Sequence, residues 1–299
     1  MQQTQALPSA DWRRKKRIRT AVNTTFAYVF TSLLALVFAS PFIWMLSMSL
    51  QGPRQLTTYP PAWIPDPVQW HNYADAMSYP MRPFSAYFKN SLVYTGVATI
   101  AVTFSSAFVA YGFSRLNFRG RDVLFVLLLS TMMLPAEVTL IPKYVLFYKI
   151  GWIDSLLPLV IPAFFGSAFD IFLLRQFFLT IPRELDEAAI LDGCDYFSIF
   201  RRIIMPLAKP AVVTVIAFSI VATWNDFMGP LIYVNSTKKL TVAVGLNLFR
   251  SMAGDTGGFV HFGQVMAASV VTLLPMIVLF LIAQRYFVSG IAMTGLKEG

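Results

Sequence analysis

Six apolar stretches, each long enough to cross a lipid bilayer, constrain this chain more than any other feature of its sequence. An α-helix needs about 20 predominantly apolar residues to span the hydrocarbon core. The clearest stretch is 26–50, because no charged residue occurs between Arg19 and Arg54. The others are 90–113, 123–142, 156–180, 210–233 and 262–287. We therefore predict an all-α membrane protein with six transmembrane helices.

The overall composition agrees with this fold class. Hydrophobic residues make up 56% of the 299 residues and charged residues only 13%, whereas about 25% of the residues in soluble domains are charged. Such a composition excludes an ordinary soluble enzyme and a disordered chain. The formal net charge of +9 is interpreted first as a signal of membrane topology, and nucleic-acid binding is not expected.

The distribution of Lys and Arg indicates how the spans are oriented, since these residues are more frequent on the cytoplasmic side. If the basic segment 13–19 is cytoplasmic, the inner segments contain nearly twice as many Lys and Arg residues as the outer segments. We therefore predict a multi-pass protein of the plasma (inner) membrane with both termini in the cytoplasm. The expected parts are a basic cytoplasmic N-terminus, 1–25, a six-helix transmembrane domain, 26–288, and a short cytoplasmic C-terminus, 289–299.

The sequence lacks the usual motifs of enzymes and metal sites. Cys194 is the only cysteine, so no intrachain disulfide can form, and His71 and His261 are far apart in the sequence. A phosphate-binding P-loop is absent, because the dipeptide Gly-Lys does not occur. We expect no catalytic residues, no metal site and no cofactor in this chain. If the protein uses ATP, another subunit binds it.

The loop between the fourth and fifth spans, 181–209, is long and patterned. Pro182 and the acidic residues after it favour the start of a helix, and Gly193 favours its end in a left-handed turn. A second helix is expected to follow and to end at Pro206 and Pro210. Its expected apolar face consists of Phe197, Phe200, Ile204 and Leu207. This helix–turn–helix could lie on the bilayer surface or receive a partner protein, and its pattern does not separate the two.

The same loop resembles the EAA loop, which marks the membrane subunits of ATP-binding-cassette importers. Met205 stands where that motif usually has Leu, a residue of similar volume and apolarity. The residues that this resemblance assigns to the coupling loop are Glu187, Ala188, Ala189, Leu191, Gly193, Ile203 and Pro206. Weaker similarities extend over nearly the whole chain, such as Trp63-Ile64-Pro65 and Met133-Leu134-Pro135. In their order and spacing they resemble the sugar-importer permeases of the maltose-transporter type.

The resemblance implies the architecture of a type I ABC importer permease, a non-catalytic subunit of a heteromeric complex. A second, different permease would share the translocation path, and an extracytoplasmic solute-binding protein would deliver the solute. Two ATPase subunits would bind ATP and Mg²⁺ and would contact loop 181–209. The expected solute is a sugar or oligosaccharide, and the alternative is a polyol or glycerol phosphate. An ion-coupled secondary transporter is a further alternative, but it would have no use for an EAA-like loop.

Acidic residues within the spans are candidates for the solute path, because a charge in the bilayer needs a partner or a wet cavity. Asp170 is the deepest, and a buried pair, an interface with the second permease and direct solute contact all remain open for it. Glu137 and Asp226 lie near the outer ends of their spans, where pairing with a loop is also open. The candidates for the solute path are Asp170, Trp224, Asn225, Asp226 and Phe227. Pro135 and Pro162 are expected to kink or unwind their helices.

Overall fold

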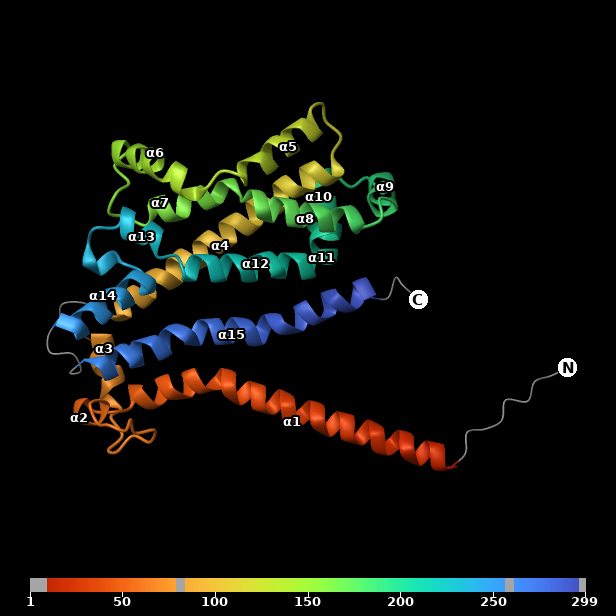
Figure 1. Ribbon diagram of the computed structural model, residues 1–299. Helices are drawn as coiled ribbons and strands as arrows, with labels where there is room; N and C mark the ends of the chain where they lie inside the picture. Colours follow the sequence, from red (N-terminus) through yellow and green to blue (C-terminus); the bar gives the residue numbers. More distant parts are fainter. Residues whose placement is uncertain (1–9, 79–83, 256–260, 296–299) are drawn as a thin grey trace.

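The structure is a computed structural model that describes residues 10–78, 84–255 and 261–295. In these residues all regular elements are helices, and Figure 1 shows the long ones lying side by side, with short helices and loops at both ends. The first and last helices, α1 (Ala10–Ser49) and α15 (Phe262–Gly295), pack against each other. The predicted all-α membrane fold is therefore confirmed. Residues 1–9 and 296–299 of the predicted termini lie outside the described residues.

In the described part of the chain, four segments are long and apolar enough to cross a membrane without a sharp bend. They are Arg19–Ser49, Phe84–Arg115, Leu157–Thr180 and Phe262–Gln284. Two pairs of helices bent by more than 40° bring the number of candidate spans to six if each pair counts as one. The structure therefore agrees with six spans, but two of them differ from the segments that the sequence predicts.

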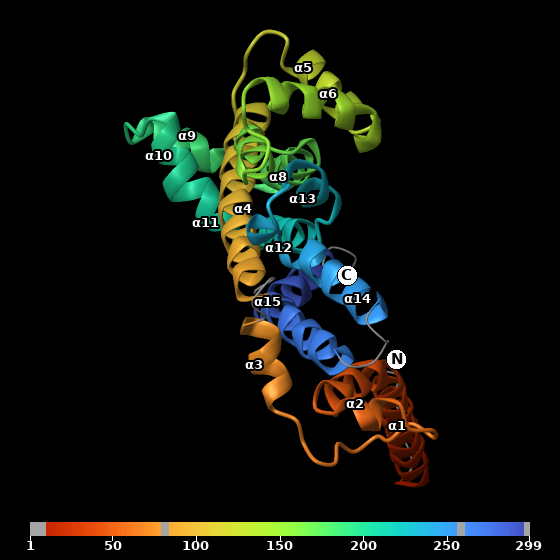
Figure 2. The ribbon, with the colours of Figure 1, turned by 90° about the vertical axis from the view of Figure 1, so that its left-hand side faces the viewer.

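Helix α4 (Phe84–Arg115) lies at the centre of the molecule. It packs along α8 (Ala168–Thr180) and α12 (Lys209–Trp224), and Figure 2 shows both on the same side of it. Small buried residues of α4, among them Ala98, Ala107 and Ala110, allow its neighbours to approach closely. The apolar interior of the helix bundle therefore lies around α4.

The fourth span is interrupted before α8. Helix α7 (Leu157–Val160) continues into a 3₁₀ turn, η1 (Ile161–Phe165), which contains Pro162, and the chain then turns at Gly166 with φ of +81°. Two serines of α4 contact this turn: Ser105 Oγ donates to the carbonyl of Ala163 at 3.2 Å, and Ser106 Oγ accepts from the N–H of Ser167 at 3.0 Å. The expected effect of Pro162 is confirmed, and α4 satisfies part of the backbone that the turn leaves unpaired.

The predicted third span, 123–142, is divided into two helices. Helix α5 (Arg121–Thr131) and helix α6 (Ala136–Lys149) meet at an angle of 94°. Pro135 precedes α6 with φ −58° and ψ 137°. Proline has no N–H to donate and disfavours a helical residue before it. The predicted break at Pro135 is confirmed, whereas a single straight helix over 123–142 is wrong.

The predicted fifth span, 210–233, is also wrong at its end. Helix α12 stops at Trp224, and α13 (Met228–Tyr233) begins only after a non-helical segment, 225–227. Asp226 explains this break: its Oδ1 accepts from the N–H of Gly229 at 3.0 Å, and its Oδ2 accepts from the hydroxyl of Tyr94 at 2.9 Å. The carboxylate thus joins the unwound segment to α4.

Short elements gather at the two ends of the long helices (Figure 1). One end holds α2 (Pro53–Leu56), α3 (His71–Ser78), α6, α13, η3 (Thr237–Lys239) and α14 (Val242–Asp255). The other end holds α9 (Glu184–Leu191), α10 (Tyr196–Ile199), a π-helical turn η2 (Phe200–Ile204) and α11 (Met205–Leu207). The beginning of α1 and the end of α15 lie at this second end, as an even number of crossings requires.

At the end of the molecule that holds α6, α13 and α14, hydrogen bonds connect loops that are distant in the sequence. Asp154 has φ of +60°, and its Oδ1 accepts from the backbone N–H of Ser236 at 2.7 Å while its Oδ2 pairs with Lys239 Nζ at 3.0 Å. Asn90 of α4 donates to the carbonyl of Leu240 at 3.0 Å. The loop after α6 and the loop after α13 are therefore fastened to each other and to α4.

Candidate functional site

The loop between α8 and α12 contains a helix that ends as the sequence predicts. Gly193 has φ of +82°, its N–H donates to the carbonyl of Ile190 at 3.0 Å, and the N–H of Cys194 donates to the carbonyl of Ala189 at 2.9 Å. This pair of bonds is a Schellman motif, in which glycine takes the left-handed position after the helix. The first turn of α9 carries Glu184, Asp186 and Glu187, which oppose the positive end of the helix dipole.

The apolar face predicted for the second helix is wrong in part. Phe200 is 3% exposed and Ile204 is fully buried, as expected, but Phe197 is 52% exposed and Leu207 is 49% exposed. Ile199 is buried in their place. The π-helical turn Phe200–Ile204 lies between the two exposed positions, and such a turn widens the helix and changes which residues share a face across it.

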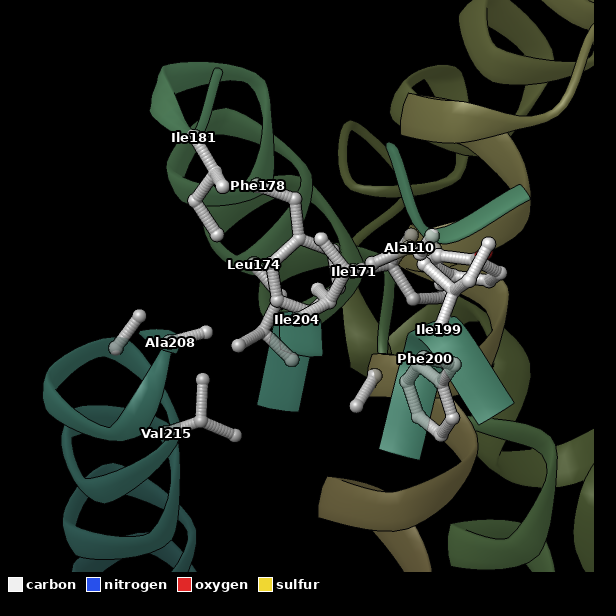
Figure 3. Packing of buried hydrophobic residues seen from close by; sticks show 14 residues of the cluster. Ala110, Ile171, Leu174, Phe178, Ile181, Ile199, Phe200, Ile204, Ala208 and Val215 are labelled. Carbon is white, nitrogen blue, oxygen red and sulfur yellow. The ribbon is translucent and has the colours of Figure 1, made fainter. Parts of the chain in front are cut away.

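The base of the loop is packed into the membrane-embedded helices. We call this group the loop-base cluster; its buried members are Ala107, Ala110, Tyr111, Ile171, Leu174, Phe178, Ile181, Ala189, Ile199, Phe200, Ile204, Ala208, Ala211 and Val215. Figure 3 shows the side chains of α8 gathered around Ile204, and Ile199 and Phe200 beside Ala110. The ring of Phe200 lies 5.2 Å from that of Tyr111 and 5.8 Å from that of Phe108. The loop is therefore fixed to α4, α8 and α12.

The far side of α9 is exposed. We call it the loop tip; it comprises Leu185, Glu187, Ala188, Ile190 and Leu191. Leu191 is 88% exposed, Ile190 48% and Leu185 41%. These exposed apolar side chains stand beside carboxylates on a helix whose base is fixed. They form a surface that no other described segment of the chain covers.

The seven residues assigned to the coupling loop divide between tip and base. Glu187, Ala188, Leu191 and Gly193 are exposed, and Ala189 is 6% exposed within the loop-base cluster. Ile203 is half-buried against the same cluster. Pro206 is exposed, just before the 80° bend that separates 196–207 from α12.

Sequence reasoning missed one residue of this site, Arg115, which it counted only among the Lys and Arg residues of the inner segments. Arg115 ends α4, and its side chain is 3% exposed. Its Nη1 lies 3.1 Å from Oδ2 of Asp186 in α9, and its Nη2 donates to the carbonyls of Phe178 at 2.6 Å and Ile181 at 2.8 Å. Burial raises the pKa of the Asp186 carboxyl, and the nearby charge of Arg115 opposes that shift.

Asp170 lies on a cleft of about 480 Å³ between α4, η1, α8 and α12. Asp170 itself is 6% exposed and sits in the first turn of α8 after the capping residue Ser167. Tyr94, which binds Asp226 at 2.9 Å, lines the same cleft. Other hydroxyl groups on the lining come from Ser167, Ser219 and Thr223. The structure therefore brings Asp170 to a mainly apolar cleft that carries a few hydroxyl groups, and it connects Asp226 to the wall of that cleft.

The remaining candidates for the solute path do not meet there. Trp224 faces an apolar groove between α4, α12 and α15, and its ring packs edge-on against Phe88 at 5.6 Å. Asn225 is exposed and donates back to α12, to the carbonyl of Val221 at 2.8 Å. Phe227 packs against the buried cluster at the opposite end of the molecule from α9. Neighbours in sequence thus point in three directions, because the helix ends at Trp224.

Comparison with known proteins identifies this arrangement. Residues 103–293 match the family described as binding-protein-dependent transport system inner membrane component. The chain is 31% identical to the trehalose/maltose transport system permease protein MalG of Thermococcus litoralis, over 89% of this chain and 94% of that protein. It is 32% identical to the sn-glycerol-3-phosphate transport system permease protein UgpE of Yersinia pestis, over 82% of this chain and 85% of that protein.

A solved structure has the same fold. It is the crystal structure of a bacterial ABC transporter involved in the import of the acidic polysaccharide alginate. One of its chains matches with a TM-score of 0.76 and 25% sequence identity, over 94% of this chain and 99% of that one.

Proposed function

This chain belongs to the family of binding-protein-dependent transport system inner membrane components, and we propose that it imports a sugar or an oligosaccharide with a second, different permease. It is a multi-pass membrane protein and a permease subunit of an ABC transporter. The chain does not hydrolyse ATP in this proposal; two partner ATPase subunits bind ATP and Mg²⁺. A binding protein outside the membrane delivers the solute.

The proposal that this chain contacts the ATPase subunits rests on the loop tip. Leu191, 88% exposed at the end of α9, protrudes on a helix whose base is held by the loop-base cluster. Ala188 is exposed and small, so a groove on a partner protein can approach the helix closely there. The exposed carboxylates of Glu187 on the tip and of Glu184 beside it are better suited to a basic protein groove than to the headgroups of anionic lipid. In the proposed complex, closing of the ATPase dimer on ATP moves α9 and changes the packing of the spans.

The proposed contact between the loop tip and the ATPase subunits also implies which side of the membrane each end of the molecule faces. The loop tip faces the cytoplasm in this proposal, and the beginning of α1 and the end of α15 lie at the same end of the molecule (Figure 1). Both termini are then cytoplasmic, and the loops held together by Asp154 and Asn90 face the binding protein.

The few polar side chains on the cleft beside Asp170 support a neutral, hydroxyl-rich solute. Among the described residues that line it are Tyr94, Ser167, Ser219, Thr223 and the carboxylate of Asp170, and none is Lys or Arg. Hydroxyl and carboxylate groups can exchange hydrogen bonds with sugar hydroxyls, whereas a phosphate group would meet the Asp170 carboxylate with no cation to offset the repulsion. Glycerol phosphate remains the alternative solute, because a relative is named for it.

The test is uptake by proteoliposomes that contain this chain, its partner permease and the ATPase subunits, with ATP inside and the solute-loaded binding protein outside. Radiolabelled neutral oligosaccharides and glycerol phosphate are offered separately. We expect uptake of a saccharide that requires both ATP and the binding protein. Uptake of glycerol phosphate alone would replace the sugar assignment. Uptake that follows an ion gradient without ATP would contradict the role of the loop tip as well.

A further inference from the structure

One buried guanidinium joins three elements at the base of the loop. Arg115 is the last residue of α4, Phe178 and Ile181 lie at the end of α8, and Asp186 lies in the first turn of α9. The contacts of Arg115 are an ion pair at 3.1 Å and two hydrogen bonds at 2.6 and 2.8 Å. Its side chain is 3% exposed and that of Asp186 15% exposed, so neither charge is held mainly by water.

The chemistry of arginine suits this position. The carbonyl of Phe178 belongs to the last turn of α8 and that of Ile181 to the residue just after it; helical carbonyls there have lost their usual partners, and the helix dipole favours a cation. A guanidinium presents several N–H donors in one rigid plane and can therefore reach both carbonyls and a carboxylate at once. A lysine ammonium at the end of a flexible chain cannot reproduce that geometry.

The junction is also incompletely paired. Arg115 Nε and Asp186 Oδ1 are both buried and have no hydrogen-bond partner among the described residues. A bidentate arginine–carboxylate pair would use two parallel hydrogen bonds, and here the carboxylate meets the guanidinium through Oδ2 and Nη1 alone.

We propose that Arg115 is a positioning residue for transport, which makes α9 move as one body with the ends of α4 and α8. This inference rests on the proposed contact between the loop tip and the ATPase subunits. A push on the tip reaches α4 and α8 through the guanidinium, because the ion pair holds α9 and the two carbonyl bonds hold the end of α8. Without the junction, α9 can yield to the ATPase while the spans stay in place.

The test compares Asp186→Asn, Arg115→Lys and the double variant in the reconstituted complete transporter. Arg119→Gln is the control, because Arg119 is an exposed arginine of the neighbouring loop. The solute taken up and the ATP hydrolysed are measured in the same vesicles. The yield of the complex of two permeases and two ATPase subunits is measured by gel filtration. We expect each single variant to lower the amount of solute moved per ATP by about fivefold or more, an ordinary size for coupling between sites.

The double variant should lower the ratio no further than the single variants, because both changes remove the same junction. A ratio within twofold of wild type in Asp186→Asn would overturn the proposal. A parallel fall of transport and ATP hydrolysis would do the same, since it indicates a merely structural role.

Glu187→Lys, at the loop tip, separates this inference from the one on which it rests. If Glu187→Lys uncouples transport and the junction variants do not, only the role of Arg115 is wrong. If Glu187→Lys transports normally, the proposed ATPase contact itself fails.

Discussion

At the scale of single residues, Gly193 sets the angle between α9 and α10 through its backbone conformation. Its φ is +82°, and a Cβ added to it would meet nothing within 4 Å. A residue with a Cβ in the left-handed conformation costs about 1–2 kcal/mol. Gly120, in the loop between α4 and α5, has φ of +87° and equally open surroundings. The two glycines therefore have matched backbone costs and differ only in their position.

We predict that Gly193→Ala and Gly193→Asp leave the chain inserted in the membrane but uncouple transport from ATP hydrolysis. The strained turn changes the presentation of the loop tip, and solute moved per ATP should fall about tenfold, as a loss of about 1.4 kcal/mol would give. Gly120→Ala introduces the same backbone strain, but it should leave the amount of solute moved per ATP at the wild-type value. Equal effects of the two alanine variants would contradict a special role for Gly193.

Asp170 gives a second prediction at this scale. Asp170 lines the cleft between α4, α8 and α12, and Asp170→Asn keeps the size of the side chain while it removes the charge. A hydrogen bond to a charged group contributes about 1.5–3 kcal/mol, so the KM for solute uptake should rise about tenfold or more while basal ATP hydrolysis is unchanged. Glu137→Gln, at an exposed carboxylate of α6, is the control. An unchanged KM in Asp170→Asn would assign Asp170 to structure or to the second permease.

At the scale of elements, the length of an apolar run predicts where a span begins. It does not predict where a helix ends when contacts with distant residues end it. The first, second and last spans lie within α1, α4 and α15, because uninterrupted apolar runs decide them. The break at 225–227 depends on Tyr94, which donates to Asp226 from 132 residues away. The π-helical turn after Ile199 has no signal in the periodicity. Arg115 reaches Phe178 across 63 residues, so its role could not be predicted from either segment alone.

The fastened loops opposite α9 give a prediction about pH. Hydrogen bonds from Ser236, and then from Lys239, hold the pKa of Asp154 well below its usual range. Because the folded pKa lies below the unfolded value of about 3.9, the stabilisation is complete above that pH and is lost as the pH falls through the folded pKa. Asp154→Asn should therefore lower Tm by a constant amount between about pH 5 and 8, with a difference that shrinks only below about pH 4.

Thermal unfolding of the purified complex over this pH range measures the difference. Asp75→Asn, at an exposed carboxylate of α3, is the matched control and should leave Tm unchanged. A Tm difference for Asp154→Asn that disappears between pH 8 and 6 would assign the effect to another group.

At the scale of the whole molecule, the loop tip and the described ends of the chain share one end, and the loops around Asp154 share the other (Figure 1). Accessibility to a membrane-impermeant maleimide can test this arrangement, because Cys194 is the only cysteine and Cys194→Ser leaves a chain without thiols. In that background Leu191→Cys places a thiol at the loop tip. We predict labelling in inside-out vesicles and none in right-side-out vesicles.

Bound ATPase subunits should reduce the labelling of Leu191→Cys. Tyr59→Cys, at a residue that is 95% exposed and close to α2, should show the opposite orientation and no protection by the ATPase subunits. Labelling of both positions from the same side would refute the six-span topology.

The separation of a packed base from an exposed tip in the 181–209 loop has a consequence for how such a subunit can change during evolution. Substitutions at the base disturb α4, α8 and α12 together, since Phe200 and Ile204 are buried among them. Substitutions of Leu185, Ile190 or Leu191 alter only the surface that a partner meets. In the proposed complex, selection can therefore exchange one ATPase for another through a few side chains of α9 and leave the specificity of the membrane path untouched.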